Sequence, residues 1–300
     1  MRLLRIRILF FAAFLCFWMA ARQEASGPVQ EESRRAEFEL SYRALQPGDV
    51  IFVKLKDGRN VSKAVAFFNG RKFPLALDHD SIRMLTLIGL GMDFKPGSYP
   101  LKVVVQYDNG QTESTSKEIF VEGKEFPVEK LWVEEKFVTP PEEVRERIQW
   151  EAELLRSLYM VSSDSWLGEG SFIIPVEGRA SDNFGKRRIF NNKPRSPHSG
   201  QDISAPSGTP VHSSNSGRVV LSKNLYFSGN TVIIDHGLGV FTYYCHFSEI
   251  SVKRGDWVRR GDLIGKVGAT GRVTGPHLHW SLRIQGTSVD PYALTHLIME

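Results

Sequence analysis

Short apolar segments separated by turn residues make up the first half of the chain. They lie at 50–55, 64–68, 84–90, 101–107 and 118–121. The pairs Asp57-Gly58, Asn69-Gly70 and Asn109-Gly110 favour tight turns between antiparallel strands. Short strands with turn signals at this spacing predict an antiparallel β-sandwich over residues 38–136.

A helical period replaces the strand pattern over residues 137–168. Thr139 and Glu142 have the spacing of a capping box, and Pro140 stands at the first helical position. Apolar residues then recur at helical intervals, namely Val144, Ile148, Ala152, Leu155 and Tyr159. The segment therefore predicts a helix of roughly twenty residues that links the two halves of the chain.

Strand patterns return over residues 169–300, with glycine and proline concentrated at the turns. Apolar or alternating segments occupy 217–222, 231–235, 240–247, 257–258, 263–267 and 277–284. These segments predict a second, mainly antiparallel β domain. The histidines of the chain concentrate in this half, and that clustering requires a chemical explanation.

Residues 1–21 have the pattern of a secretory signal. Three arginines precede an apolar run over residues 8–21, which is too short to cross a bilayer core of about 30 Å comfortably as a helix. Small residues follow near a possible cleavage point, and an uncleaved N-terminal anchor is the alternative. Residues 22–37, rich in Gln, Glu, Ser and Arg, predict a flexible linker. We therefore expect an exported protein of the periplasm or cell envelope.

Composition and charge exclude several functional classes. With 41% hydrophobic and 24% charged residues in 300, the chain is balanced like a globular protein, and not like a disordered or multi-span membrane protein. The formal net charge is +4, but three of the 38 basic side chains lie in residues 1–21, which leaves 35 against 34 acidic ones. A nucleic-acid partner is therefore not expected.

Cys245 is the one cysteine after the apolar run, so the rest of the chain cannot form an intramolecular disulfide. This suits an oxidising compartment. On a strand, Cys245 and His246 would point to opposite faces and could not act as a nucleophile and its base. We interpret Cys245 as a buried, inert thiol.

A metal-ligand pattern stands at two places in the second half. His198 and Asp202 are four residues apart with Gly200 between them, which favours a loop that enters a strand. On a strand, His277 and His279 share one face. Imidazoles with one carboxylate suit zinc, and three protein ligands with one open position are typical of a catalytic zinc site. The pattern alone leaves open which of His277 and His279 is the ligand.

The same alternation places Tyr244 and His246 on one face of their strand. A histidine beside the metal but not bound to it is suited to acid or base catalysis. Tyr244 is a candidate for lining the substrate groove. No His-Glu-x-x-His sequence occurs, so the glutamate base of that class of metalloprotease is absent.

These motifs, taken in order, resemble those of the LytM/lysostaphin-type zinc endopeptidases, which cut peptidoglycan. They are His198-x-x-x-Asp202, Tyr244-x-His246 and Gly275-Pro276-His277-Leu278-His279, with Lys253-Arg254-Gly255-Asp256-Trp257-Val258 between the last two. The resemblance covers about residues 170–291. The first half is similar to the immunoglobulin-like domain that precedes the peptidase in some bacterial members.

The resemblance implies one zinc ion held by His198, Asp202 and His279, and an unligated catalytic pair, His246 and His277, whose individual roles stay open. It also implies a mainly β fold: an immunoglobulin-like β-sandwich, a linking α-helix, and a C-terminal antiparallel β-sheet peptidase domain of the duplicated hybrid motif type. The implied substrates are peptidoglycan stem peptides. Direct D-Ala–diaminopimelate cross-links are favoured over glycine bridges, because no Gly-rich wall-targeting domain is apparent.

Two other functions are alternatives. Non-enzymatic relatives of the same fold activate or recruit other wall hydrolases, but they lack some of the five polar residues, all of which are present here. A phosphocarrier of similar fold uses two facing histidines, but the signal and Asp202 speak against that cytoplasmic chemistry. Arg195 and Arg272 are candidates for contacts with an acidic muropeptide. Whether the first domain or the helix restricts the groove stays open.

Overall fold

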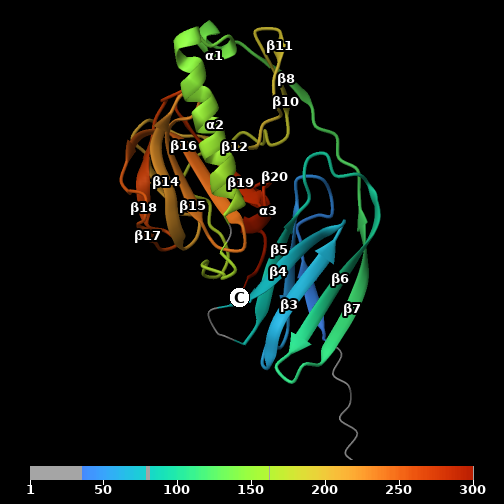
Figure 1. The fold of residues 1–300 in the computed structure, drawn as a ribbon. Coiled ribbons are helices and arrows are strands. Elements are labelled where there is room, and N and C mark those ends of the chain that lie inside the picture. Colours follow the sequence, from blue (N-terminus) through green and yellow to red (C-terminus); the bar gives the residue numbers. More distant parts are fainter. Residues whose placement is uncertain (1–35, 79–81, 162, 300) are drawn as a thin grey trace, which may run out of the picture. The chain divides into compact units, whose positions relative to one another are not determined.

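The structure, a computed structural model, describes residues 36–78, 82–161 and 163–299. The signal, and the linker up to residue 35, lie outside the described residues, and their interpretation stays a prediction. The described part is mainly β, as predicted (Figure 1). Within it, no helix has both the length and the apolar character needed to cross a membrane.

Seven strands of the first half form one antiparallel sheet in the order β1-β2-β5-β4-β3-β6-β7. They are β1 (Phe38–Ser41), β2 (Val50–Leu55), β3 (Val61–Phe68), β4 (Arg71–Leu77), β5 (Met84–Gly89), β6 (Gly97–Tyr107) and β7 (Thr112–Val121). Asn69 and Gly70, with φ of +46° and +72°, make the left-handed turn between β3 and β4. Asp57-Gly58 lies between β2 and β3, which do not pair, so it is not a hairpin turn.

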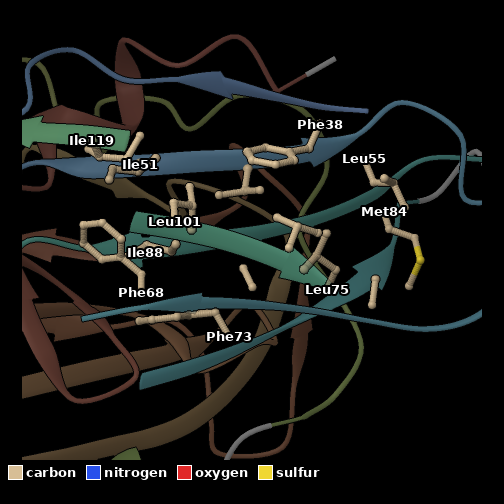
Figure 2. Close-up of a cluster of buried hydrophobic side chains, with 14 of the residues drawn as sticks. Phe38, Ile51, Leu55, Phe68, Phe73, Leu75, Met84, Ile88, Leu101 and Ile119 are labelled. Carbon is tan, nitrogen blue, oxygen red and sulfur yellow. The ribbon is translucent and has the colours of Figure 1, made fainter. Parts of the chain in front are cut away.

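Side-chain alternation explains the core of this sheet. On β6, Leu101, Val103 and Val105 are buried, whereas Lys102 and Gln106 are exposed. Figure 2 shows the resulting cluster of apolar side chains, to which every strand of the sheet contributes. The antiparallel β prediction is confirmed here, and the immunoglobulin-like interpretation stays a prediction.

The linking segment differs from its prediction at the helix start. Its elements are β8 (Val128–Leu131), α1 (Glu135–Val138), a 3-10 turn (Glu142–Val144) and α2 (Arg145–Met160). Thr139 does not cap α2, because it ends α1 and donates its hydroxyl hydrogen to Glu135 Oε1 at 2.7 Å. Pro141 is extended, with φ of −57° and ψ of 155°, and the chain becomes α-helical only at Arg145. The helix therefore has 16 residues.

The second half forms a ten-stranded sheet whose central path runs β17-β14-β15-β16-β19-β12-β9. The longer strands are β12 (Gly200–Ser204), β14 (Gly217–Leu225), β15 (Gly229–Asp235), β16 (Val240–Ile250), β18 (Leu263–Val267) and β19 (His277–Ile284). The shorter ones are β9 (Arg179–Ala180), β13 (Pro210–His212), β17 (Trp257–Val258) and β20 (Thr287–Val289). Strands β10 (Arg187–Phe190) and β11 (Lys193–Pro194) form a separate three-stranded sheet with β8, and a short helix, α3 (Tyr292–Thr295), follows β20.

The two faces of the large sheet are covered differently. Leu278 and Trp280 of β19 are fully buried in a core on one face. On the other face, helix α2 lies across the sheet (Figure 1). Leu155 and Tyr159 of the helix pack against Phe241 and its neighbours. The Tyr159 and Phe241 rings are 5.4 Å apart, centroid to centroid. Helix α2 therefore covers one part of this face and leaves the rest open.

A fourth apolar cluster joins the two large sheets within residues 35–300, which form one compact unit. Phe52 and Leu87 of the first sheet belong to the same buried cluster as Leu282 and Leu294. Beside them, Arg43 pairs with both Asp49 and Asp290 at 2.8 Å. The first sheet therefore packs directly against the second through this apolar cluster and the Arg43 ion pairs.

Candidate metal centre and catalytic groove

Sheet register brings two of the predicted metal ligands together. Asp202 of β12 is the direct partner of His279 on β19, and paired residues on neighbouring strands share a face. His198 lies in the loop that enters β12. His279 Nδ1 lies 2.8 Å from both Asp202 Oδ1 and His198 Nε2, and His198 Nε2 lies 3.2 Å from Asp202 Oδ1. Three potential ligand atoms thus converge on one point.

Asn183 and Arg188 hold this group in place, and the sequence pattern gave no sign of either. Asn183 accepts a hydrogen bond from His198 Nδ1 on its backbone oxygen at 3.1 Å, and its side-chain amide donates to Asp202 Oδ2 at 2.8 Å. Arg188 donates to the same carboxylate oxygen at 3.2 Å. A carbonyl oxygen only accepts, so His198 Nδ1 donates to it, and His198 Nε2 is turned toward Asp202 and His279.

The environment keeps the candidate ligands in the forms that bind metal. Burial by itself would raise the pKa of Asp202, but hydrogen bonds from His198 and His279 outweigh it and hold that pKa well below its usual value. Burial lowers the pKa of His279 to about 4. At neutral pH the carboxyl is therefore ionised and the His279 imidazole is neutral.

The donor set fits a zinc ion. Zinc prefers nitrogen, sulfur and carboxylate ligands at about 2.0–2.2 Å in a tetrahedral arrangement, which separates the ligand atoms by about 3.3 Å. The three atoms here are 2.8 to 3.2 Å apart. His198, Asp202 and His279 also form the one group of three or more histidine, cysteine or acidic side chains with metal-binding spacing among the described residues.

His246 and His277 form a second imidazole pair beside this group. Their ring centroids are 4.8 Å apart. His246 Nδ1 donates to Thr270 O at 2.8 Å and His277 Nδ1 donates to Gly275 O at 2.9 Å, so each ring keeps Nε2 free of hydrogen when neutral. Burial, followed by the charges of His277 and His279, lowers the pKa of His246 to about 3.

A break in strand alternation produces this arrangement and overturns one prediction. The pairing of β15 with β16 shifts register between Asn230 and Val232, and His246 has a φ of +68°. Cys245 and His246 therefore both line the groove, whereas Tyr244 is fully buried and donates its hydroxyl hydrogen to Ser214 Oγ at 2.8 Å. Tyr244 is a core residue and has no contact with the groove.

Cys245 lines the cavity but is poorly suited to act as a nucleophile. The residue is buried, with 2% of its surface exposed. Burial raises the pKa of its thiol well above the usual value, and the charge of Asp202 adds to the effect. The thiol therefore stays protonated at neutral pH, although the alternation argument for an opposite face was wrong.

The groove is a cavity of about 1250 Å³. The candidate ligands and the imidazole pair lie on its sheet side, and Leu155, Tyr159 and Val138 of the linking helices line another part. Tyr243, next to the buried Tyr244, is the tyrosine of this strand that faces the cavity. Such a volume accommodates a branched peptide segment.

An antiparallel sheet that presents two imidazoles and a carboxylate to a groove defines a candidate metal-dependent hydrolase. Comparisons with known proteins narrow that class. Residues 196–291 match the model of peptidase family M23. The crystal structure of a putative peptidase M23 from Pseudomonas aeruginosa is 31% identical, with a TM-score of 0.63 over 84% of this chain and 95% of that one. The chain belongs to peptidase family M23.

Curated relatives match over a smaller part of the chain. The chain is 48% identical over 119 residues to the peptidoglycan DD-endopeptidase ShyA of Vibrio cholerae, which covers 39% of this chain and 28% of ShyA. It is 46% identical over 97 residues to the DD-carboxypeptidase/endopeptidase Mpg of Neisseria meningitidis, which covers 32% of this chain and 22% of Mpg. The match spans less than a third of either relative.

Proposed function

We propose that this chain is an exported zinc metalloendopeptidase that hydrolyses the peptide cross-links of bacterial peptidoglycan. The observation that carries the proposal is the convergence of His198 Nε2, His279 Nδ1 and Asp202 Oδ1 on one point of an open groove. Family membership and the named activities of ShyA and Mpg support the peptide substrate. Within this proposal, residues 169–300 carry the peptidase domain and residues 38–136 a separate β domain.

His198, Asp202 and His279 would hold the ion. A bound zinc ion supplies Lewis acidity, which makes a water molecule more acidic and polarises a carbonyl group. Asn183 and Arg188 hold the Asp202 carboxylate in the orientation that faces the two histidines. These contacts fix the ligand atoms before any ion arrives.

His246 and His277 would supply the acid–base chemistry of amide hydrolysis. The attacking water must lose a proton, and the leaving amine must gain one. Each imidazole is oriented through its Nδ1 and offers Nε2 for a proton. A pair with ring centroids 4.8 Å apart places a second imidazole within reach of the same substrate atoms.

We further propose that the bond cut joins two D-configured centres, as in direct D-Ala–diaminopimelate cross-links. ShyA is named a peptidoglycan DD-endopeptidase and Mpg a DD-carboxypeptidase/endopeptidase, which supports this choice. A non-enzymatic role as an activator is less well supported, because all five polar residues gather at one groove. In a scaffold protein nothing would require an oriented imidazole pair beside a metal-binding donor set.

Digestion of purified sacculi by the full-length chain tests the proposal. We expect soluble fragments whose new termini, identified by mass spectrometry, are the carboxyl group of D-Ala and the amine of diaminopimelate. A chelator should abolish the release, and stoichiometric zinc should restore it. A folded protein that contains no zinc and takes none up, or that releases no peptide termini when loaded, would contradict the proposal.

A further inference from the structure

Three arginine side chains gather on the wall of the groove next to the candidate metal ligands. Arg188, Arg195 and Arg272 all line the cavity, and we call them the arginine cluster. They come from β10, from the loop after β11 and from the loop before β19. The metal-binding and acid–base roles proposed above require only Arg188, through its contact with Asp202. The other two guanidinium groups need a separate explanation.

Arg272 is held by aromatic rings and not by an acid. Its guanidinium carbon lies 4.8 Å from the ring centroids of both Phe190 and Phe227. Among residues 36–78, 82–161 and 163–299, no ion pair joins it to a carboxylate. The two rings hold the guanidinium in place, but they leave its five N–H groups without a charged acceptor among the described residues.

The charges of the cluster are not balanced. Within the described part of the chain, the Arg195 guanidinium donates to two backbone oxygens, of Val138 at 2.6 Å and of Pro194 at 3.1 Å. Arg188 donates to Asp202, yet its Nε is buried and has no hydrogen-bond partner in the described part of the chain. Among the described residues the three guanidinium groups therefore have one ion pair with a carboxylate, that of Arg188 with Asp202, and Asp202 is also a candidate metal ligand.

This excess of positive charge acts on Arg272. Burial lowers its pKa to about 10, and repulsion by Arg188 and then Arg195 adds to the shift. Like charges in a partly buried place destabilise a fold unless an anion neutralises them. Guanidinium groups with free N–H donors bind a carboxylate in two parallel hydrogen bonds.

We propose that the arginine cluster binds the free carboxylate that stands next to the scissile bond, on the residue that leaves as the amine. This inference rests on the proposed function, and it identifies the substrate class. In a D-Ala–diaminopimelate cross-link, the carbon attached to the scissile nitrogen also bears a free carboxylate. Arg188 of the cluster is hydrogen-bonded to the candidate metal ligand Asp202, so the cluster lies next to the place where the scissile bond would be cut. A carboxylate on the carbon next to the scissile nitrogen is therefore close enough to reach the cluster. An internal glycine–glycine bond has no such carboxylate.

Hydrolysis of two matched peptides tests the proposal. Both are soluble cross-linked dimers with a D-Ala–diaminopimelate bond, and they differ only in a free carboxylate or a carboxamide on the carbon next to the scissile nitrogen. We expect kcat/KM of the zinc-loaded chain to be about ten- to a hundredfold higher for the carboxylate peptide, as for a charge-assisted hydrogen bond. Equal values for the two peptides would overturn the proposal.

Variants test whether the arginine cluster causes the preference for the carboxylate peptide. In Arg272→Gln the ratio between the two peptides should fall toward one, mainly through a higher KM for the carboxylate peptide. Arg195→Gln provides a second variant in case the first does not fold, which circular dichroism decides. Arg254 is exposed on a turn outside the cavity, so Arg254→Gln is the matched control and should keep the wild-type ratio. A wild-type ratio in both cluster variants would overturn the proposal.

Binding to chelated protein separates this proposal from the proposed function. The probe is the tripeptide L-Ala-D-Glu-diaminopimelate, compared with its carboxamide at the D-centre, titrated calorimetrically into the full chain in excess chelator. We expect the carboxylate to bind at least tenfold more tightly without metal, and Arg272→Gln to remove the difference. If the carboxylate probe bound more tightly than the carboxamide only when zinc is present, the ion and not the arginine cluster would hold the carboxylate. That result would overturn the proposal. If zinc-loaded protein cut neither dimer, the proposed function would fail while this titration still decided the cluster.

Discussion

Asp202 on β12 lies directly opposite His279 on β19, and their side chains are joined by a hydrogen bond of 2.8 Å. These residues are 77 positions apart, so only the antiparallel register brings them together. A slip of one residue would turn His279 to the face where Leu278 and Trp280 form the core. The candidate metal centre is therefore a property of strand pairing, and changes that disturb the pairing should affect metal binding.

Removing a candidate ligand should remove the metal. In Asp202→Ala, two imidazoles remain, and Arg188 loses its carboxylate partner. We expect zinc content, measured by plasma mass spectrometry after dialysis, to fall from one ion per chain to well below one, and sacculus digestion to stop. Glu249→Ala is a control, because Glu249 is exposed and, among the described residues, its ion pair is with Lys266. Full zinc content in Asp202→Ala would rule out this assignment.

Replacing an imidazole of the second pair should separate catalysis from metal binding. His246→Ala and His277→Ala remove a proton-transfer group but none of the three convergent ligand atoms. We expect turnover to fall by about two orders of magnitude or more, in the usual range for acid–base groups. Zinc content, measured in the same preparations, should stay at one ion per chain. Loss of zinc from His246→Ala would instead make His246 a ligand.

The sequence predicted the elements whose pattern is regular. Strands β2, β5 and β19 begin at the residues that their apolar segments indicated. Strand β4 was missed, because Lys72 and Pro74 interrupt its apolar pattern and conceal the alternation. The capping box failed because the two prolines favour extended backbone before the helix.

Faces and partners within the site were harder to predict. Alternation correctly placed His277 and His279 on one face, since β19 is regular. It misplaced Tyr244 and Cys245, because the register shift in β16 depends on pairing with β15 and not on local sequence. Asn183 and Arg188 could not be found from spacing, because their contacts with Asp202 arise only when distant loops meet.

Gly200 offers a test of the register without replacing a ligand, although a methyl group here would also lie 3.0 Å from His279 Cε1. A methyl group here would lie 2.5 Å from Trp280 O and 2.6 Å from Ser281 Cβ, which is too close for real contacts. Gly200→Ala should therefore push β12 away from β19, separate Asp202 from His279 and weaken zinc affinity at least tenfold in a competitive chelator titration. At Gly123 the nearest atom would be 3.9 Å away, so Gly123→Ala is the control and should keep wild-type affinity. Unchanged affinity in Gly200→Ala would contradict the register argument.

His236 should make the fold sensitive to acid. It is fully buried between Ser216 O and Thr242 Oγ1, and burial lowers its pKa to about 4 from an ordinary 6.5. Between these values the unfolded chain binds one more proton at this site, so the free energy of unfolding falls as the pH falls, by about 1.4 kcal/mol per pH unit.

Urea denaturation of chelated protein at pH 7.5, 6.0 and 5.0 measures the slope of this free energy against pH. His246 and His279 also contribute to the slope, because their pKa values are lowered too. His236→Gln should reduce the slope by one proton. A slope that His236→Gln leaves intact would show that His236 does not titrate in this range.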